Sequence, residues 1–118
     1  MTLCPRCRGP LETDQAISLG PDDYNDEYTF KTFHCTACPL VGAGYYEESR
    51  RGSSERWHHE GFETSRADYD RVNREIASCS TPRAAHCSCE VHERYRGTTG
   101  SHAAIHLVTR IGESFTLG

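Results

Sequence analysis

Two pairs of cysteines in the first third of the chain have the spacing of metal ligands. Cys4 and Cys7 form one Cys-x-x-Cys pair, and Cys35 and Cys38 form another. Two intervening residues let one tight turn aim both sulfurs at a single point, and four thiolates satisfy the tetrahedral preference of zinc. The spacing therefore predicts a closed zinc site. The alternative is four buried or redox-active thiols, although a thioredoxin-like pair requires a βαβ pattern that this segment lacks.

A second group of possible ligands lies in the last third of the chain. Three thiols and a histidine would complete another four-ligand zinc site, and with the first site they account for every cysteine in the chain. The alternatives are buried or surface thiols, an iron–sulfur cluster or a catalytic metal site. Nearby glutamates do not stand in the zinc-deaminase motif, which argues against that reaction. The predicted ligands are Cys79, Cys87, Cys89 and His92, with His86 as an alternative to His92.

The residues around the two Cys-x-x-Cys pairs are predicted to form short strands. Residues 11–19 form a weakly alternating segment, residues 20–26 are rich in turn formers, and residues 28–34 alternate aromatic and β-branched side chains. The second strand would return Cys35 and Cys38 to the side of the first pair. A third strand is predicted around residues 45–48, so the ribbon would be a hairpin extended to three strands.

Residues 2–50 resemble the zinc-ribbon superfamily. The resemblance rests on the four cysteines and on the turn Arg8-Gly9-Pro10 after the first pair. It implies a small β-hairpin fold around one structural zinc ion. Ribbons occur in proteins of very different function, some of which act on the transcription machinery, so the resemblance suggests a transcription-related role only by analogy. Pro39 follows the last cysteine where many ribbons have glycine nearby, and the hairpin turn is acidic.

The remaining chain predicts helices, a loop and one strand. Ser53 or Ser54 could cap a short helix that carries Trp57 and ends near Gly61. A longer helix over residues 65–78 has apolar residues at helical spacing, and residues 104–111 alternate as a strand. We therefore expect an α+β protein: a ribbon over residues 1–50, and over 51–118 one main helix, a metal-bound loop and a C-terminal strand, packed together as one compact unit.

Composition restricts the compartment and the class of partner. Apolar residues make up 36% of the chain, which predicts a small core supported by metal cross-links. An odd number of cysteines, the paired spacing and the absence of an apolar signal segment predict a reducing, cytoplasmic location. The net charge of −4 does not favour a protein whose main task is to grip nucleic acid.

The sequence contains no phosphate-binding loop, nucleophile elbow or His-Glu-x-x-His motif. We therefore expect a non-enzymatic adaptor or regulator that binds another macromolecule. We expect this partner to be a protein rather than a nucleic acid. Two alternatives stay open. The chain could bind nucleic acid through arginines and neighbouring aromatics, or the Cys79–His92 group could be a catalytic metal or thiol site. The residues expected to contact a partner are Asp22, Asp23, Asp26, Glu27, Arg50 and Arg51.

Overall fold

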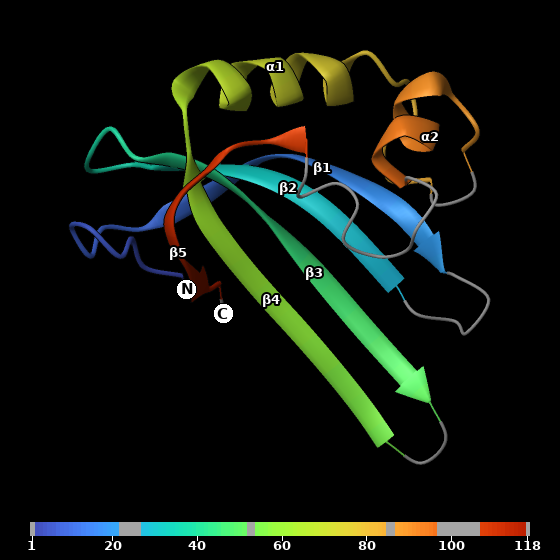
Figure 1. Ribbon diagram of the computed structural model, residues 1–118, viewed down its shortest axis with the longest axis horizontal. Coiled ribbons are helices and arrows are strands. Elements are labelled where there is room, and N and C mark those ends of the chain that lie inside the picture. Colours follow the sequence, from blue (N-terminus) through green and yellow to red (C-terminus); the bar gives the residue numbers. More distant parts are fainter. Residues whose placement is uncertain (1, 22–26, 52–53, 85–86, 97–106, 118) are drawn as a thin grey trace.

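The computed structural model describes residues 2–21, 27–51, 54–84, 87–96 and 107–117. They form one antiparallel sheet in which each strand pairs with the next along the chain. Figure 1 shows the sheet as strongly twisted, with the long β3–β4 pair extending beyond the ends of β1 and β2. The strands are β1 (Leu11–Pro21), β2 (Glu27–Cys35), β3 (Val41–Arg51), β4 (Ser54–Thr64) and β5 (Arg110–Thr116).

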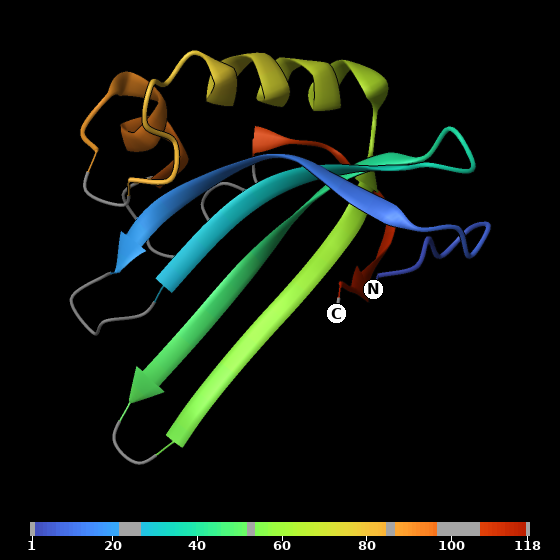
Figure 2. The same ribbon diagram turned by 180° about the vertical axis from the view of Figure 1, so that it is seen from behind.

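Two helices pack against one face of the sheet, which we call the helix face. They are α1 (Arg66–Ala77) and α2 (Glu90–Arg96), and Figure 2 shows them together on one side of the strands. The Ser65 side chain caps α1 by accepting a hydrogen bond from the Asp68 N–H. The predicted helix over 65–78 is therefore confirmed.

The main core lies between the helices and the sheet. Alternate residues of the strands face the helices, because successive side chains of a strand point to opposite faces. Phe30 of β2 meets Tyr95 of α2 edge to face, with ring centroids 5.8 Å apart. Each fully buried side chain of this size contributes about 1.5–3 kcal/mol. The core is built from Ile17, Leu19, Tyr28, Phe30, Ala43, Phe62, Val72, Ile76, Val91, Tyr95 and Val108.

A smaller core lies on the opposite face, which we call the rear face. Leu117 packs there over Gly44 and Gly61, since both glycines lack a side chain that would fill this space. Phe115 and Phe33 meet edge to face at 5.8 Å. The end of the chain thus covers the rear face and lies beside the start of the chain, as Figure 1 shows.

The prediction of a short helix ending near Gly61 is wrong, because these residues belong to β4. Ten consecutive residues of β4 pair with β3, including His59 with Tyr46 and Phe62 with Ala43. Phe62 is buried in the main core. Tertiary pairing therefore overrides the weak helical pattern. The described residues form a five-stranded sheet, whereas four strands were predicted, three in the ribbon and one near the C-terminus.

Two further differences concern the last third of the chain. The C-terminal strand exists, but β5 covers Arg110–Thr116 rather than residues 104–111. Residues 104–106 lie outside the described part of the chain, and Ile111 is exposed. The sequence does not predict α2, which begins inside the expected metal-bound loop.

Within the described residues, no helix is long and apolar enough to cross a membrane.

A substitution at Gly42 tests how closely β3 approaches the backbone of β4 and the Phe33 ring. A Cβ atom at this position would lie 2.4 Å from the Phe62 carbonyl oxygen and 2.7 Å from the Phe33 ring. We expect Gly42→Ala to lower the free energy of unfolding by about 1–3 kcal/mol, because backbone and ring must shift. Denaturant unfolding measures the change, with the exposed Ser114→Ala as control. Equal unfolding free energies of Gly42→Ala and the unaltered protein would contradict this packing.

Candidate metal centres

The four cysteines of the first group converge at one end of the sheet. Cys4 and Cys7 precede β1, Cys35 ends β2, and Cys38 lies in the turn before β3. Their sulfur atoms all lie within 4.8 Å of one another. The Sγ atoms of Cys4 and Cys38 are 3.7 Å apart, and those of Cys7 and Cys35 are 3.4 Å apart. The sequence-predicted set is therefore brought together, and we call it the ribbon cluster.

The two Cys-x-x-Cys turns of the ribbon cluster have matching backbone hydrogen bonds. The Cys4 N–H donates to the Gly9 carbonyl at 2.7 Å, and the Cys35 N–H donates to the Leu40 carbonyl at 2.9 Å. Each donor and acceptor are five residues apart in both turns. The turns also aim N–H groups at sulfur: Arg6 N–H lies 3.4 Å from Cys4 Sγ, and Ala37 N–H lies 3.3 Å from Cys35 Sγ. Such donors stabilise thiolates.

The ribbon cluster is part of the rear core. Cys4 and Cys35 are buried, Cys38 is half-buried and Cys7 is exposed. Phe33, Leu40 and Leu117 pack around the buried thiols. Folding of the rear face and convergence of the four sulfurs therefore depend on each other.

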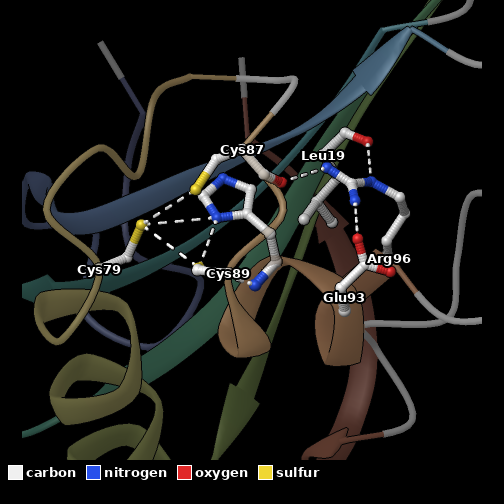
Figure 3. Close-up of polar contacts among 7 residues, drawn as sticks. Leu19, Cys79, Cys87, Cys89, Glu93 and Arg96 are labelled. Carbon is white, nitrogen blue, oxygen red and sulfur yellow. Dashed lines mark hydrogen bonds and ion pairs between the residues drawn. The ribbon is translucent and has the colours of Figure 1, made fainter.

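The second predicted set also converges, and we call it the loop cluster. Cys79 follows α1, Cys87 and Cys89 lie in the loop before α2, and His92 is in α2. The four donor atoms lie within 4.8 Å of one another. Cys79 Sγ is 3.8 Å from Cys87 Sγ and 3.6 Å from Cys89 Sγ, as Figure 3 shows. His86, the alternative ligand, lies outside the described residues.

His92 offers its Nδ1 atom to the loop cluster. This nitrogen lies 3.5 Å from Cys79 Sγ and 3.2 Å from Cys89 Sγ. The side chain is fully buried, and its Nε2 atom has no hydrogen-bond partner among the described residues. The ring is thus oriented by packing and by the thiols, without the second hydrogen bond that commonly holds a ligating histidine.

Arg96 joins the loop cluster to the sheet. Its guanidinium donates to the Leu19 carbonyl of β1 at 3.2 Å and to the Cys87 carbonyl at 3.0 Å. It also pairs with Glu93 at 3.0 Å, and Figure 3 shows all three contacts. One planar side chain therefore fixes a ligand-bearing loop against a strand edge.

Both clusters fit a four-coordinate metal ion. Around a tetrahedral ion with metal–sulfur bonds of about 2.3 Å, neighbouring sulfurs lie about 3.8 Å apart. The observed sulfur separations of 3.4–3.8 Å match this spacing. They exceed the disulfide bond length of about 2.05 Å, and all seven cysteines are free. Either group could hold a metal ion.

One thiol in each cluster is prepared for ligation. Burial raises the pKa of Cys35, but hydrogen bonds from the Ala37 N–H and the neighbouring cysteines outweigh burial and lower that pKa to about 7. The Cys89 N–H and the Thr81 hydroxyl lower the pKa of Cys87 to about 7 as well. Because thiolates rather than thiols bind metal, the surroundings of these two sulfurs favour the form that binds metal.

A polar network that the sequence does not single out lies beside the ribbon cluster. His34 Nδ1 is 2.8 Å from the Asp14 carboxylate, which also accepts a hydrogen bond from the Tyr69 hydroxyl of α1. Burial and the Asp14 carboxylate raise the pKa of Tyr69 to about 12. The network borders a pocket of about 250 Å³ and fixes α1 to β1 and β2. Only the position of His34 next to Cys35 could have drawn attention to it.

Three of the six residues expected to contact a partner lie in strands of the described part of the chain. Asp22, Asp23 and Asp26 lie outside the described residues. Glu27 begins β2, and Arg50 and Arg51 end β3. The strand pairing places these two arginines in the part of the β3–β4 pair that extends past the first residue of β2.

Comparison of the chain with protein-family models, with curated proteins and with solved structures found no match. The likeness to zinc ribbons therefore rests on the four converging cysteines of the ribbon cluster. This likeness concerns the kind of metal site and does not assign the chain to a family.

Two adjacent substitutions in the first turn should have opposite effects. A Cβ atom at Gly9 would lie 2.6 Å from Ala37 Cβ and 3.3 Å from Cys7 Sγ, so Gly9→Ala should spread the ribbon cluster and speed metal loss to a chelator. Arg8 has a φ of 69°, which costs a non-glycine residue about 1 kcal/mol or more. Arg8→Gly should therefore keep or raise thermal stability. Equal chelator resistance of both variants would contradict this geometry.

Loss of Arg96 should weaken the loop cluster selectively. We expect Arg96→Ala to release one of two metal equivalents to a chelator about tenfold faster, since supporting contacts of this kind are worth about 10- to 100-fold in metal affinity. Arg96→Lys should recover little, because lysine lacks the planar fork. The control is Arg94→Ala, on the same helix, whose side chain pairs with Glu75. Equally fast release in this control would contradict a specific role for Arg96.

Proposed function

We propose that both clusters bind zinc as closed structural sites, and that the protein is a non-enzymatic adaptor or regulator that binds another protein. The observation that carries this proposal is the ligand count: each cluster supplies four protein donors within 4.8 Å. Four protein ligands complete the tetrahedral shell of zinc and leave no position for substrate. Catalytic zinc sites keep such a position open.

The donor types favour zinc over other metals. The ribbon cluster offers four sulfurs, and the loop cluster offers three sulfurs and one imidazole nitrogen. Tetrahedral sites of this composition are typical of zinc, whereas magnesium and calcium require oxygen ligands. Iron also accepts four thiolates, so the ion must be identified by direct analysis.

The extended β3–β4 pair supports a binding role. Glu27 of β2 pairs with Glu48 of β3, and beyond this point β3 continues to Arg51, which pairs with Ser54 of β4. Figure 1 shows this two-stranded extension projecting from the body of the protein. Arg50 and Arg51 lie on it, and arginine is favoured at protein interfaces. We propose this extension as the partner contact, with the acidic residues 22–27 as a second contact.

Cobalt substitution tests whether the sites are closed. Cobalt(II) in a shell of four protein ligands should give strong visible bands and thiolate charge-transfer bands that do not change when azide or cyanide is added. A spectrum altered by these anions, with the protein still folded, would indicate an open coordination position. That result would favour the alternative of a metal enzyme.

Partner capture tests the adaptor role. The zinc-loaded protein and an Arg50→Glu/Arg51→Glu variant would serve as bait in a reducing cell extract treated with nuclease. We expect a protein retained in constant ratio by the unaltered bait and at least tenfold less by the variant. Arg74→Glu, an exposed change on α1, is the charge control. Retention that nuclease abolishes would instead support the nucleic-acid alternative.

A further inference from the structure

Cys7 differs from the other cysteines in its access to solvent. All seven cysteines lie in the described part of the chain, and Cys7 is the only exposed one among them. Its neighbours Pro5, Arg6 and Arg8 are exposed as well, so the outer side of this turn faces solvent. A small reagent in solution therefore reaches Cys7 before it reaches the buried thiols of the ribbon cluster.

Cys35 is placed to react with Cys7. The Sγ atoms of the two residues are 3.4 Å apart, a shorter distance than the 3.7 Å between the Sγ atoms of Cys4 and Cys38. Cys7 precedes β1 and Cys35 ends β2, so a bond between them would join the two turns of the ribbon cluster. A disulfide bond is about 2.05 Å long, which requires the two sulfurs to move closer together.

The loop cluster is better shielded from solvent than the ribbon cluster. Cys79 is buried, and Cys87 and Cys89 are half-buried. The fourth donor, His92, is fully buried. Arg96 further fixes this loop by donating to the Cys87 carbonyl at 3.0 Å. The two clusters therefore have similar ligands but different access for a reagent.

The segment that carries Cys7 also ties both ends of the chain to the rear face. The Thr2 hydroxyl donates to the Leu117 carbonyl, and Arg6 pairs with Glu63 of β4 at 2.7 Å. Leu117 belongs to the rear core that surrounds the buried thiols, and this core shares no side chain with the main core. A change at the ribbon cluster should therefore loosen the rear face and leave the helix face in place.

We propose that Cys7 is an oxidation site through which hydrogen peroxide opens the ribbon cluster. The Cys7 thiolate attacks one peroxide oxygen, the O–O bond breaks, and Cys7 becomes a sulfenic acid while hydroxide leaves. The Cys35 thiolate then attacks the Cys7 sulfur, the S–O bond breaks, and a disulfide forms as a second hydroxide leaves. Two thiolates are thus oxidised, one peroxide is reduced, and both hydroxides take up protons to form water.

The Cys7–Cys35 disulfide removes two of the four donors of the ribbon cluster. Two remaining thiolates do not complete a tetrahedral shell, so the cluster loses its metal ion and the rear face loosens around Leu117. The loop cluster has no exposed thiol and keeps its ion. This inference rests on the proposed zinc sites and adds regulation by oxidation to them.

Stepwise oxidation of the purified protein tests the role of Cys7. Native mass spectrometry first counts zinc on the reduced chain. Hydrogen peroxide is then added, released zinc is followed with a zinc-sensitive dye, and disulfides are mapped after the free thiols are trapped. We expect the loss of one of two zinc ions together with a Cys7–Cys35 disulfide, while Cys79, Cys87 and Cys89 stay reduced.

Two failures are distinguishable in this experiment. A reduced chain that carries fewer than two zinc ions would contradict the proposed function, whereas the disulfide map tests Cys7 whatever that count is. Oxidation of the loop cysteines first, or a disulfide of Cys7 with Cys4 in place of Cys35, would overturn the inference. Full retention of both ions and of all free thiols in peroxide would overturn it as well.

Histidine variants separate the exposed thiol from the cluster as a whole. Cys7→His keeps a zinc ligand at the exposed position but removes the reactive sulfur, so peroxide should release its ribbon zinc more slowly. Cys38→His makes the same exchange at a half-buried ligand and should lose zinc as fast as the unaltered protein. Equal release from Cys7→His and the unaltered protein would overturn the inference. If Cys7→His does not bind two zinc ions, the disulfide map of the unaltered protein decides.

Amide hydrogen exchange measures the structural response to oxidation. The Leu117 N–H donates to the His59 carbonyl at 2.7 Å, and the Tyr69 N–H of α1 donates to the Ser65 carbonyl at 3.0 Å. Peroxide should speed exchange of the Leu117 amide and leave that of the Tyr69 amide unchanged. Equal protection of the Leu117 amide before and after formation of the disulfide would overturn the proposed loosening of the rear face.

Discussion

Four donor atoms converge within 4.8 Å at each end of β1, and the rest of the structure depends on this convergence. The ribbon cluster precedes Leu11, and the loop cluster is fixed near Leu19 through Arg96. Four thiolates at this spacing would repel one another, and a bound cation would neutralise them. The seven free cysteines could therefore cross-link the chain through metal ions rather than through disulfides.

Metal ions bound at the two clusters would add to the stability that the modest apolar core supplies. The main core fills the space between the helices and the sheet, while the rear core includes the ligands Cys4 and Cys35 themselves. Apparent binding energies of structural zinc are about 10–16 kcal/mol in small peptides, comparable to the whole stability of a small domain. The loop cluster also includes His92 of α2, and Tyr95 of the same helix contacts Phe30. A metal ion bound there would therefore help to hold the helix side of the main core.

The sequence predicts features that depend on local spacing and misses those that depend on strand pairing. Both ligand sets follow from cysteine and histidine spacing, and α1 follows from its Ser65 cap and its apolar stripe. β4 was not predicted, because Trp57 and Gly61 fit a short helix until pairing with β3 is known.

Native mass spectrometry of the purified protein tests the central claim most directly, because it counts and identifies metal ions on the folded chain. The account predicts two zinc ions per chain of 118 residues. Removal of both ions by a chelator at neutral pH should unfold the protein, and added zinc should restore the fold. A metal-free chain that keeps the same circular dichroism spectrum and melting temperature would contradict the claim that metal binding holds this fold together.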